Sequence, residues 1–172
     1  MKNKIFSMLV VAAAMLFGST FSAIADGHKG MNVPKIKATA VMTGLENPWD
    51  MAFLSDGTMF YTEKCKGLSV RTKSGKTHAL YGMKGSSGYS ASGADLFCDG
   101  QAGMLGVVPD GNFAKNRTLY VYSTSTKYHG SGCKSNFEKC DGNIVMKFKV
   151  AKNLKSVSDR TDIVKDIQYK PF

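Results

Sequence analysis

Short apolar runs set the fold class of this chain. From residue 38 onward, apolar and polar residues alternate with a period of two over short stretches, and clusters of Gly, Asp, Asn and Ser separate these stretches. No segment has the period of an amphipathic helix over a useful length, so the pattern predicts an all-β protein. The expected strands, in chain order, are residues 38–43, 50–53, 59–62, 68–71, 77–80, 103–108, 119–123, 143–150 and 162–166.

The strands fall into two sets joined by a glycine- and serine-rich loop. Turn signals divide residues 50–80 into a four-stranded meander, and a second set of four strands has a long insertion between its second and third strand. In each set an apolar first strand meets an Asp-Gly turn, Asp56-Gly57 or Asp110-Gly111, and an aromatic-rich strand follows. Repeated four-stranded meanders are typical of β-propeller blades, and a β-sandwich is the alternative.

This pattern predicts a partial β-propeller over residues 38–172. Blade one is expected at about 38–81, the linking loop at 82–102 and blade two at about 103–168, after a flexible polar stretch at 26–37. Two blades do not close a ring. They would therefore expose an apolar blade face and unpaired strand edges, which invite aggregation or pairing with a complementary piece.

The first 25 residues have the pattern of a cleavable signal peptide. Lys2 and Lys4 form a basic region, residues 5–17 are an uncharged and mainly apolar run, and residues 23–25 (AIA) supply a small-residue cleavage site. An uncleaved anchor is the alternative, but the run is shorter than the roughly 20 residues that span a bilayer. We expect a periplasmic or secreted protein with no membrane segment after cleavage.

The net charge is +10, and removal of Lys2 and Lys4 with the signal leaves +8, because the first 25 residues contain no Asp or Glu. The lysines are scattered along the chain rather than gathered with aromatic residues in one stripe, which argues against nucleic-acid binding. The charge fits a role in solubility or attraction to an acidic partner.

Four cysteines follow the signal segment: Cys65, Cys98, Cys133 and Cys140. An even count in an exported chain predicts two disulfides with three possible pairings. Cys133 and Cys140 bracket a short polar loop and are the favoured pair, which leaves Cys65 with Cys98. A metal site with His129 nearby is the alternative, although the spacing is unlike that of zinc sites. Blade topology places the loops of all four cysteines at one face, where functional loops are expected.

Two segments resemble the glucose/sorbosone dehydrogenase family of soluble quinoproteins. Residues 44–57 (GLENPWDMAFLSDG), continued by 61–64 (YTEK), are similar to the opening blade of that family. Residues 99–116 (DGQAGMLGVVPDGNFAKN), continued by 119–122 (LYVY), are similar to its next motif. The resemblance implies an exported six-bladed propeller that binds pyrroloquinoline quinone (PQQ) with calcium and oxidises the C1 hydroxyl of aldoses.

The resemblance also implies one site residue, Gln101, which matches a glutamine at the mouth of the family's active site. An amide there can donate to a quinone or sugar oxygen and accept from a hydroxyl. The alternative is that Gln101 only caps the loop before the first strand of blade two. Asp95 and Asp99 flank the same loop and could contact a cation, although turn-forming aspartates are commoner.

The departures from the family pattern concern catalysis. The family's catalytic histidine and its calcium ligands belong to later motifs, so we expect no catalytic residue and no metal ligand in this chain. His28, His78 and His129 do not match that histidine, and Val108 replaces the histidine of a His-Pro-Asp motif. The expected protein is the N-terminal part of an aldose dehydrogenase, inactive alone. A non-catalytic exported binding module and a basic docking partner of an acidic redox protein, such as a cytochrome c, are the alternatives.

Overall fold

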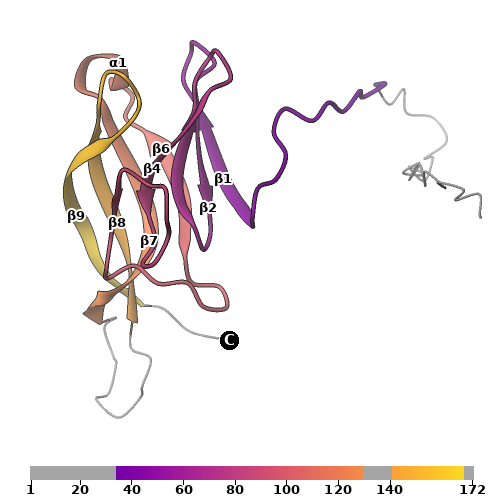
Figure 1. Cartoon of the computed structure of the whole chain (residues 1–172). Coiled ribbons are helices and arrows are strands. Elements are labelled where there is room, and N and C mark those ends of the chain that lie inside the picture. The colour runs from indigo at the N-terminus through magenta and orange to yellow at the C-terminus, as the bar shows by residue number, and fades with distance from the viewer. Residues whose placement is uncertain (1–33, 130–140, 169–172) are drawn as a thin grey trace, which may run out of the picture. The chain divides into compact units, whose positions relative to one another are not determined.

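Two antiparallel meanders make up the part of the chain that the structure, a computed structural model, describes, namely residues 34–129 and 141–168 (Figure 1). The chain divides into two units, residues 1–39 and 40–172, and each is considered by itself. In the first unit, residues 34–39 are irregular and exposed. The second unit holds every strand. Among the described residues no helix is long and apolar enough to cross a membrane.

Sheet A contains five strands in the order β1-β2-β3-β4-β5. Its strands are β1 (Pro48–Phe53), β2 (Met59–Glu63), β3 (Gly67–Arg71), β4 (Thr77–Gly82) and β5 (Ala91–Ser92). The first four pair antiparallel, and the short β5 pairs parallel with β4. The β1–β2 turn forms as predicted, because Gly57 takes a φ of 84° and the Asp56 carboxylate accepts a hydrogen bond from the Thr58 amide at 2.9 Å.

Sheet B contains four strands in the order β6-β7-β8-β9, all antiparallel. Its elements are β6 (Met104–Pro109), the short helix α1 (Phe113–Asn116), β7 (Thr118–His129), β8 (Asp141–Val150) and β9 (Val157–Gln168). The all-β class and the two successive four-stranded meanders are therefore confirmed.

One expected strand is wrong. Residues 38–43 are irregular, and Val41 is 70% exposed. Period-two alternation favours a strand only where a neighbour can pair with its backbone, and no described strand pairs with this segment. The structure also adds β5 and α1, and it begins β9 at Val157, ahead of the expected residue 162.

The hydrophobic core lies between the two sheets. Phe60, Leu68 and Val70 of sheet A belong to the same buried cluster as Val121 and Met146 of sheet B. The rings of Phe60 and Phe113, from α1, meet edge to face with centroids 5.4 Å apart. The sheets therefore stabilise each other through one shared core.

Two hydrogen bonds cross between the sheets beside this core. The Val107 amide of β6 donates to the Asp50 carboxylate of β1 at 2.8 Å, and the Thr62 hydroxyl of β2 donates to the Leu105 carbonyl. These bonds fix β6 next to β1 and β2 and so set the position of sheet B relative to sheet A.

Because Phe60 is fully buried at the contact between the sheets, Phe60→Ala should lower the free energy of unfolding by about 3–5 kcal/mol. Phe60→Leu keeps most of the volume and should lose less than half as much. Urea denaturation followed by circular dichroism measures both. Equal losses for the two variants would contradict the assigned packing.

Candidate functional site

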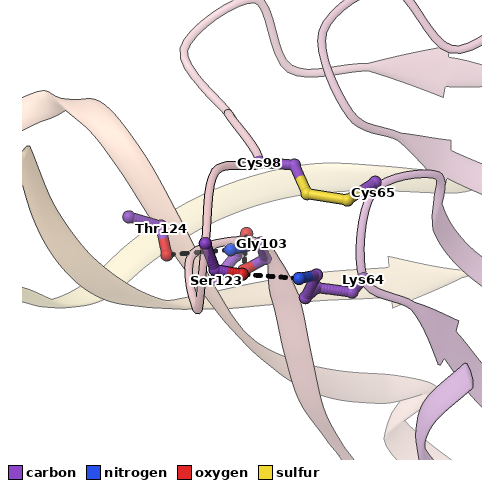
Figure 2. Close-up of a disulfide and its surroundings, with 7 residues drawn as sticks. Lys64, Cys65, Cys98, Gly103, Ser123 and Thr124 are labelled. Carbon is purple, nitrogen blue, oxygen red and sulfur yellow. Dashed lines mark hydrogen bonds between the residues drawn. A yellow bond between two sulfur atoms is a disulfide. The ribbon is translucent and has the colours of Figure 1, made fainter. Parts of the chain in front are cut away.

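Loops from both sheets meet at one end of the strands. The turn between β2 and β3, the linking loop, the start of β6 and the middle of β7 come together there, and we call this region the loop face (Figure 2). The amide of Met104, the first residue of β6, donates to the Lys64 carbonyl of the β2–β3 turn at 2.9 Å. The two sheets are thus joined at this end by backbone as well as by side chains.

A disulfide between Cys65 and Cys98 ties the β2–β3 turn to the linking loop (Figure 2). Their Cα atoms lie 5.2 Å apart, and the bridge spans 33 residues of sequence. This pairing of Cys65 with Cys98 was expected from the sequence. Cys133 and Cys140 themselves lie outside the described residues, so their pairing stays a prediction.

Gly103 closes the linking loop against sheet B in a conformation that requires glycine. Its φ is 154°, and a Cβ atom there would lie 2.5 Å from the Lys64 carbonyl oxygen. Its amide donates to the Thr124 hydroxyl at 3.1 Å, and its carbonyl accepts from the Ser123 hydroxyl at 3.2 Å (Figure 2). The close approach of two backbones explains the glycine in the motif.

Gln101 lies between these fixed points, in a turn at the loop face, and is exposed. On its N-terminal side the Gly100 carbonyl accepts a hydrogen bond from the Lys64 ammonium at 2.6 Å. On its C-terminal side the Ala102 amide donates to the Asp99 carbonyl at 2.7 Å. The backbone of Gln101 is therefore held on both sides, and the residue itself is exposed to solvent.

Arg160 of β9 clamps the linking loop through Asp95. Its terminal nitrogens donate to the two Asp95 carboxylate oxygens at 2.7 and 2.6 Å, and its Nε donates to Asp162 at 2.9 Å. The Tyr81 hydroxyl of β4 accepts a further bond at 3.2 Å, and Asp95 also accepts one from Ser125 of β7 at 2.6 Å. The cluster fastens the loop to both sheets.

This cluster sets the charge state of Asp95. Burial alone would raise the pKa of the Asp95 carboxyl, but hydrogen bonds from Arg160 and Ser125 outweigh burial and lower its pKa to about 2. Both carboxylate oxygens are occupied by these protein donors. Asp95 thus acts as the anchor of a loop, and the suggested contact with a cation finds no support in its geometry.

Two histidines belong to strands in the part of the chain that the structure describes. His78 lies in β4, paired with Val70, and His129 ends β7. No group of three or more His, Cys, Asp or Glu side chains gathers within residues 34–129 and 141–168. At the loop face the described residues therefore supply the exposed amide of Gln101, but they contain no set of metal ligands.

Sequence reasoning missed two residues that shape this region. The sequence does not indicate the contact made by Arg160, because an isolated arginine in an outer strand matches no motif and its partner Asp95 is 65 residues away in sequence. Lys64 belonged to a recognised segment, but nothing in that segment indicated that its carbonyl and its ammonium both bind residues of the linking loop and β6.

Comparison with known proteins agrees with this geometry. The two sheets match part of the propeller of sugar dehydrogenases, so the chain is a partial propeller of that class. A family model described as Glucose / Sorbosone dehydrogenase matches residues 45–171. The chain belongs to this family.

Solved structures support the same fold. The PQQ-bound aldose sugar dehydrogenase of Streptomyces coelicolor matches with a TM-score of 0.56 and 17% identity, over 76% of this chain and 33% of that one. The apo-form of the soluble aldose sugar dehydrogenase of Escherichia coli matches with a TM-score of 0.51 and 24% identity, over 70% of this chain and 30% of that one. The chain therefore spans about a third of each.

A curated relative is more similar in sequence. The uncharacterized protein slr1608 of Synechocystis is 39% identical over 98 residues, which are 56% of this chain and 23% of that protein. The chain thus spans about a quarter of this relative, whose name states no activity.

Removal of the Cys65–Cys98 bridge should cost about 3–4 kcal/mol of unfolding free energy, because the bridge closes a loop of 33 residues. The double variant Cys65→Ser/Cys98→Ser, compared with the parent in urea under non-reducing conditions, measures this loss. The single variant Cys98→Ser should lose a similar amount. A double variant as stable as the parent would show that the bridge does not restrain the loop.

The Asp95–Arg160 contact makes stability depend on acid. The folded-state pKa of Asp95 is about 2, below the value of about 3.9 in unfolded chains, so its stabilisation is present above about pH 4 and lost as the pH falls toward 2. Asp95→Asn should therefore be less stable than the parent at pH 7, and the difference should vanish near pH 2. Chemical denaturation at several pH values measures it. Asp159→Asn, at an exposed position of β9 next to Arg160, is the control and should run parallel to the parent.

Proposed function

We propose that this chain forms two blades of an exported, PQQ-dependent sugar dehydrogenase that oxidises the C1 hydroxyl of an aldose. The family match over residues 45–171 carries the proposal. The position of Gln101, exposed on the loop face and held on both sides, supports it. The proposed ligands at that face are the quinone and the sugar.

Gln101 would position these ligands rather than react with them. The side-chain amide has donors for a quinone or sugar oxygen and an acceptor for a sugar hydroxyl. The quinone, when bound, supplies the acceptor of the hydride that leaves C1. The Cys65–Cys98 bridge, Gly103 and the Arg160 clamp would keep Gln101 in place, since a small displacement of a positioning group can slow a reaction strongly.

The proton acceptor and the calcium ligands would come from other blades. His78 of β4 pairs in register with Val70, whereas Gln101 lies just before β6 at the loop face. The catalytic centre would then be complete only in a closed ring. This chain by itself is not expected to turn over sugar.

The proposed location is the periplasm or the exterior of the cell. The basic, apolar and small-residue pattern of residues 1–25 supports this location, although these residues lie outside the described part of the chain. A Cys65–Cys98 disulfide suits an oxidising compartment as well. The net charge of +8 that remains after removal of Lys2 and Lys4 with the signal favours an acidic electron acceptor, such as a cytochrome c, as the partner.

The activity of a longer form that contains this sequence tests the proposal. With PQQ, calcium, glucose or another aldose and an artificial electron acceptor, the longer form should turn over and the chain alone should not. In the longer form, Gln101→Ala should lower kcat/KM about 10-fold, the cost of one or two lost hydrogen bonds.

Asn112→Ala is the matched control for that substitution. Asn112 is exposed and follows β6, whereas Gln101 precedes it, so the two amides lie at opposite ends of that strand. Its kcat/KM should equal that of the parent. A longer form inactive with every aldose tried would overturn the proposed activity, and equal losses for the two variants would overturn the role of Gln101.

A further inference from the structure

The positive charge of the chain gathers at the end of the strands that is opposite to the loop face. Four turns lie there, namely β1–β2 (54–58), β3–β4 (72–76), the α1 segment between β6 and β7 (110–117) and β8–β9 (151–156). We call these turns, with the strand residues beside them, the turn face. Its cationic residues are Arg71, Lys73, Lys76, Lys115, Arg117, Lys149, Lys152 and Lys155.

Strand register and side-chain contacts bring the four turns together (Figure 1). In sheet A, Met59 at the start of β2 pairs with the last residue of β1 and with the last residue of β3. In sheet B, the Arg117 guanidinium donates to the carbonyl oxygens of Val150 and Ala151 at 3.3 and 2.9 Å, which joins the α1 segment to the β8–β9 turn. A cavity of about 520 Å³ is lined by residues of both the β1–β2 turn and the α1 segment. The four turns therefore form one continuous surface.

The turn face holds the excess charge of the second unit. Against its eight cations stand three carboxylates, Asp56, Asp110 and Asp159, so its net charge is +5. The other described residues from 40 onward carry seven cations and eight carboxylates, a net charge of −1. Lysines that are scattered along the sequence are thus gathered by the fold at one end of the sheets.

The carboxylates of the turn face stabilise its turns, whereas its lysines are open to solvent. Asp56 accepts a hydrogen bond from the Thr58 amide, and Asp110 accepts bonds from the Asn112 amide at 2.8 Å and the Asn116 side chain at 2.7 Å. All six lysines of the face are exposed. The ion pairs of the described residues all lie outside this face, so its excess charge is not neutralised there.

The composition of the turn face fits a diffuse anionic surface. None of the exposed residues in its four turns is aromatic, whereas specific protein interfaces are anchored by Tyr, Trp and Arg and contain little Lys. Single-stranded nucleic acid would likewise need aromatic side chains on which bases stack. The Arg117 guanidinium is engaged by two carbonyl oxygens and lies 4.5 Å from the Phe113 ring centroid. The charges that remain are mainly lysine ammonium groups, which act as separate point charges.

We propose that the turn face binds the headgroups of an anionic phospholipid bilayer. Each lysine near such a surface strengthens binding about fivefold, so several exposed lysines together give reversible attachment. The loop face with Gln101 then points away from the bilayer, because it lies at the other end of the same strands. This attachment does not depend on sugar or quinone chemistry, so either proposal can fail while the other stands.

Sedimentation with lipid vesicles tests the attachment. The chain from residue 26 onward is used, because every described strand lies after residue 40 and the apolar run 5–17 would bind vesicles by itself. It should bind vesicles in which about a third of the lipid is phosphatidylglycerol, and it should leave pure phosphatidylcholine vesicles unbound. Binding should weaken steeply as the salt concentration rises toward about 1 M. Equal binding to the two kinds of vesicle would overturn the proposal.

Neutralised lysines give the sharper test. A triple variant of the turn face should lower the partition coefficient on anionic vesicles about 100-fold, which is fivefold per lysine. Its substitutions are Lys115→Gln, Lys152→Gln and Lys155→Gln.

The charge-matched control removes three exposed lysines outside the turn face. It should stay within about threefold of the parent, because these positions do not approach the bilayer. Its substitutions are Lys84→Gln, Lys127→Gln and Lys165→Gln. Equal losses for the two triple variants would show that the net charge, and not the turn face, decides binding.

Circular dichroism checks that each variant retains its strands. If the triple variant of the turn face does not fold, Lys73→Gln/Lys76→Gln in the exposed β3–β4 turn replaces it, with an expected loss of about 25-fold. An unchanged partition coefficient for that double variant would overturn the proposal.

Two further outcomes would assign the binding elsewhere. Trp49, the only tryptophan, lies in β1 outside the turn face and is 49% exposed, so anionic vesicles that contain brominated lipid should leave its fluorescence unquenched. Quenching would mean that the exposed apolar residues of β1 enter the bilayer instead. Binding to immobilised polyglutamate without binding to anionic vesicles would assign the turn face to an acidic protein. Either result would overturn the proposal.

Discussion

The shared core between the two sheets is the contact on which the rest of the structure depends. Neither meander covers its own apolar surface: Phe60, Leu68 and Val70 of sheet A are buried in one cluster with Val121 and Met146 of sheet B. A small number of strands with one uncovered apolar face is not stable alone in water. The Asp50 carboxylate and the Thr62 hydroxyl then fix one sheet relative to the other.

The loop face follows from that contact. Because β6 is held beside β1 and β2, the end of the linking loop approaches the β2–β3 turn closely enough for Gly103 to touch the Lys64 carbonyl. The disulfide and the Arg160–Asp95 pair add two restraints at other points of the loop. Three restraints of different chemistry, a backbone approach, a covalent bridge and an ion pair, thus hold one exposed segment.

The sequence was informative where local rules decide the structure. Alternation and turn residues such as Asp56-Gly57 predicted eight of the strands and both meanders, because pairing between neighbours in sequence needs no distant information. The same alternation misled for residues 38–43, where a strand depends on a partner that local pattern does not reveal. The site divided in the same way: blade topology placed Cys65 and Cys98 at one face, whereas the contact of Arg160 with Asp95 spans 65 residues of sequence. The signal segment and the second cysteine pair stay predictions.

The Cys65–Cys98 bridge has a consequence for the order in which the protein matures. Everything between the two cysteines belongs to β3, β4, β5 and their connections, all of sheet A or its outgoing loop. Because synthesis and export proceed from the N-terminus, both cysteines are available before any residue of sheet B. The disulfide can therefore form while the apolar face of sheet A is still uncovered. It would then restrain the β2–β3 turn and the linking loop before sheet B packs on sheet A.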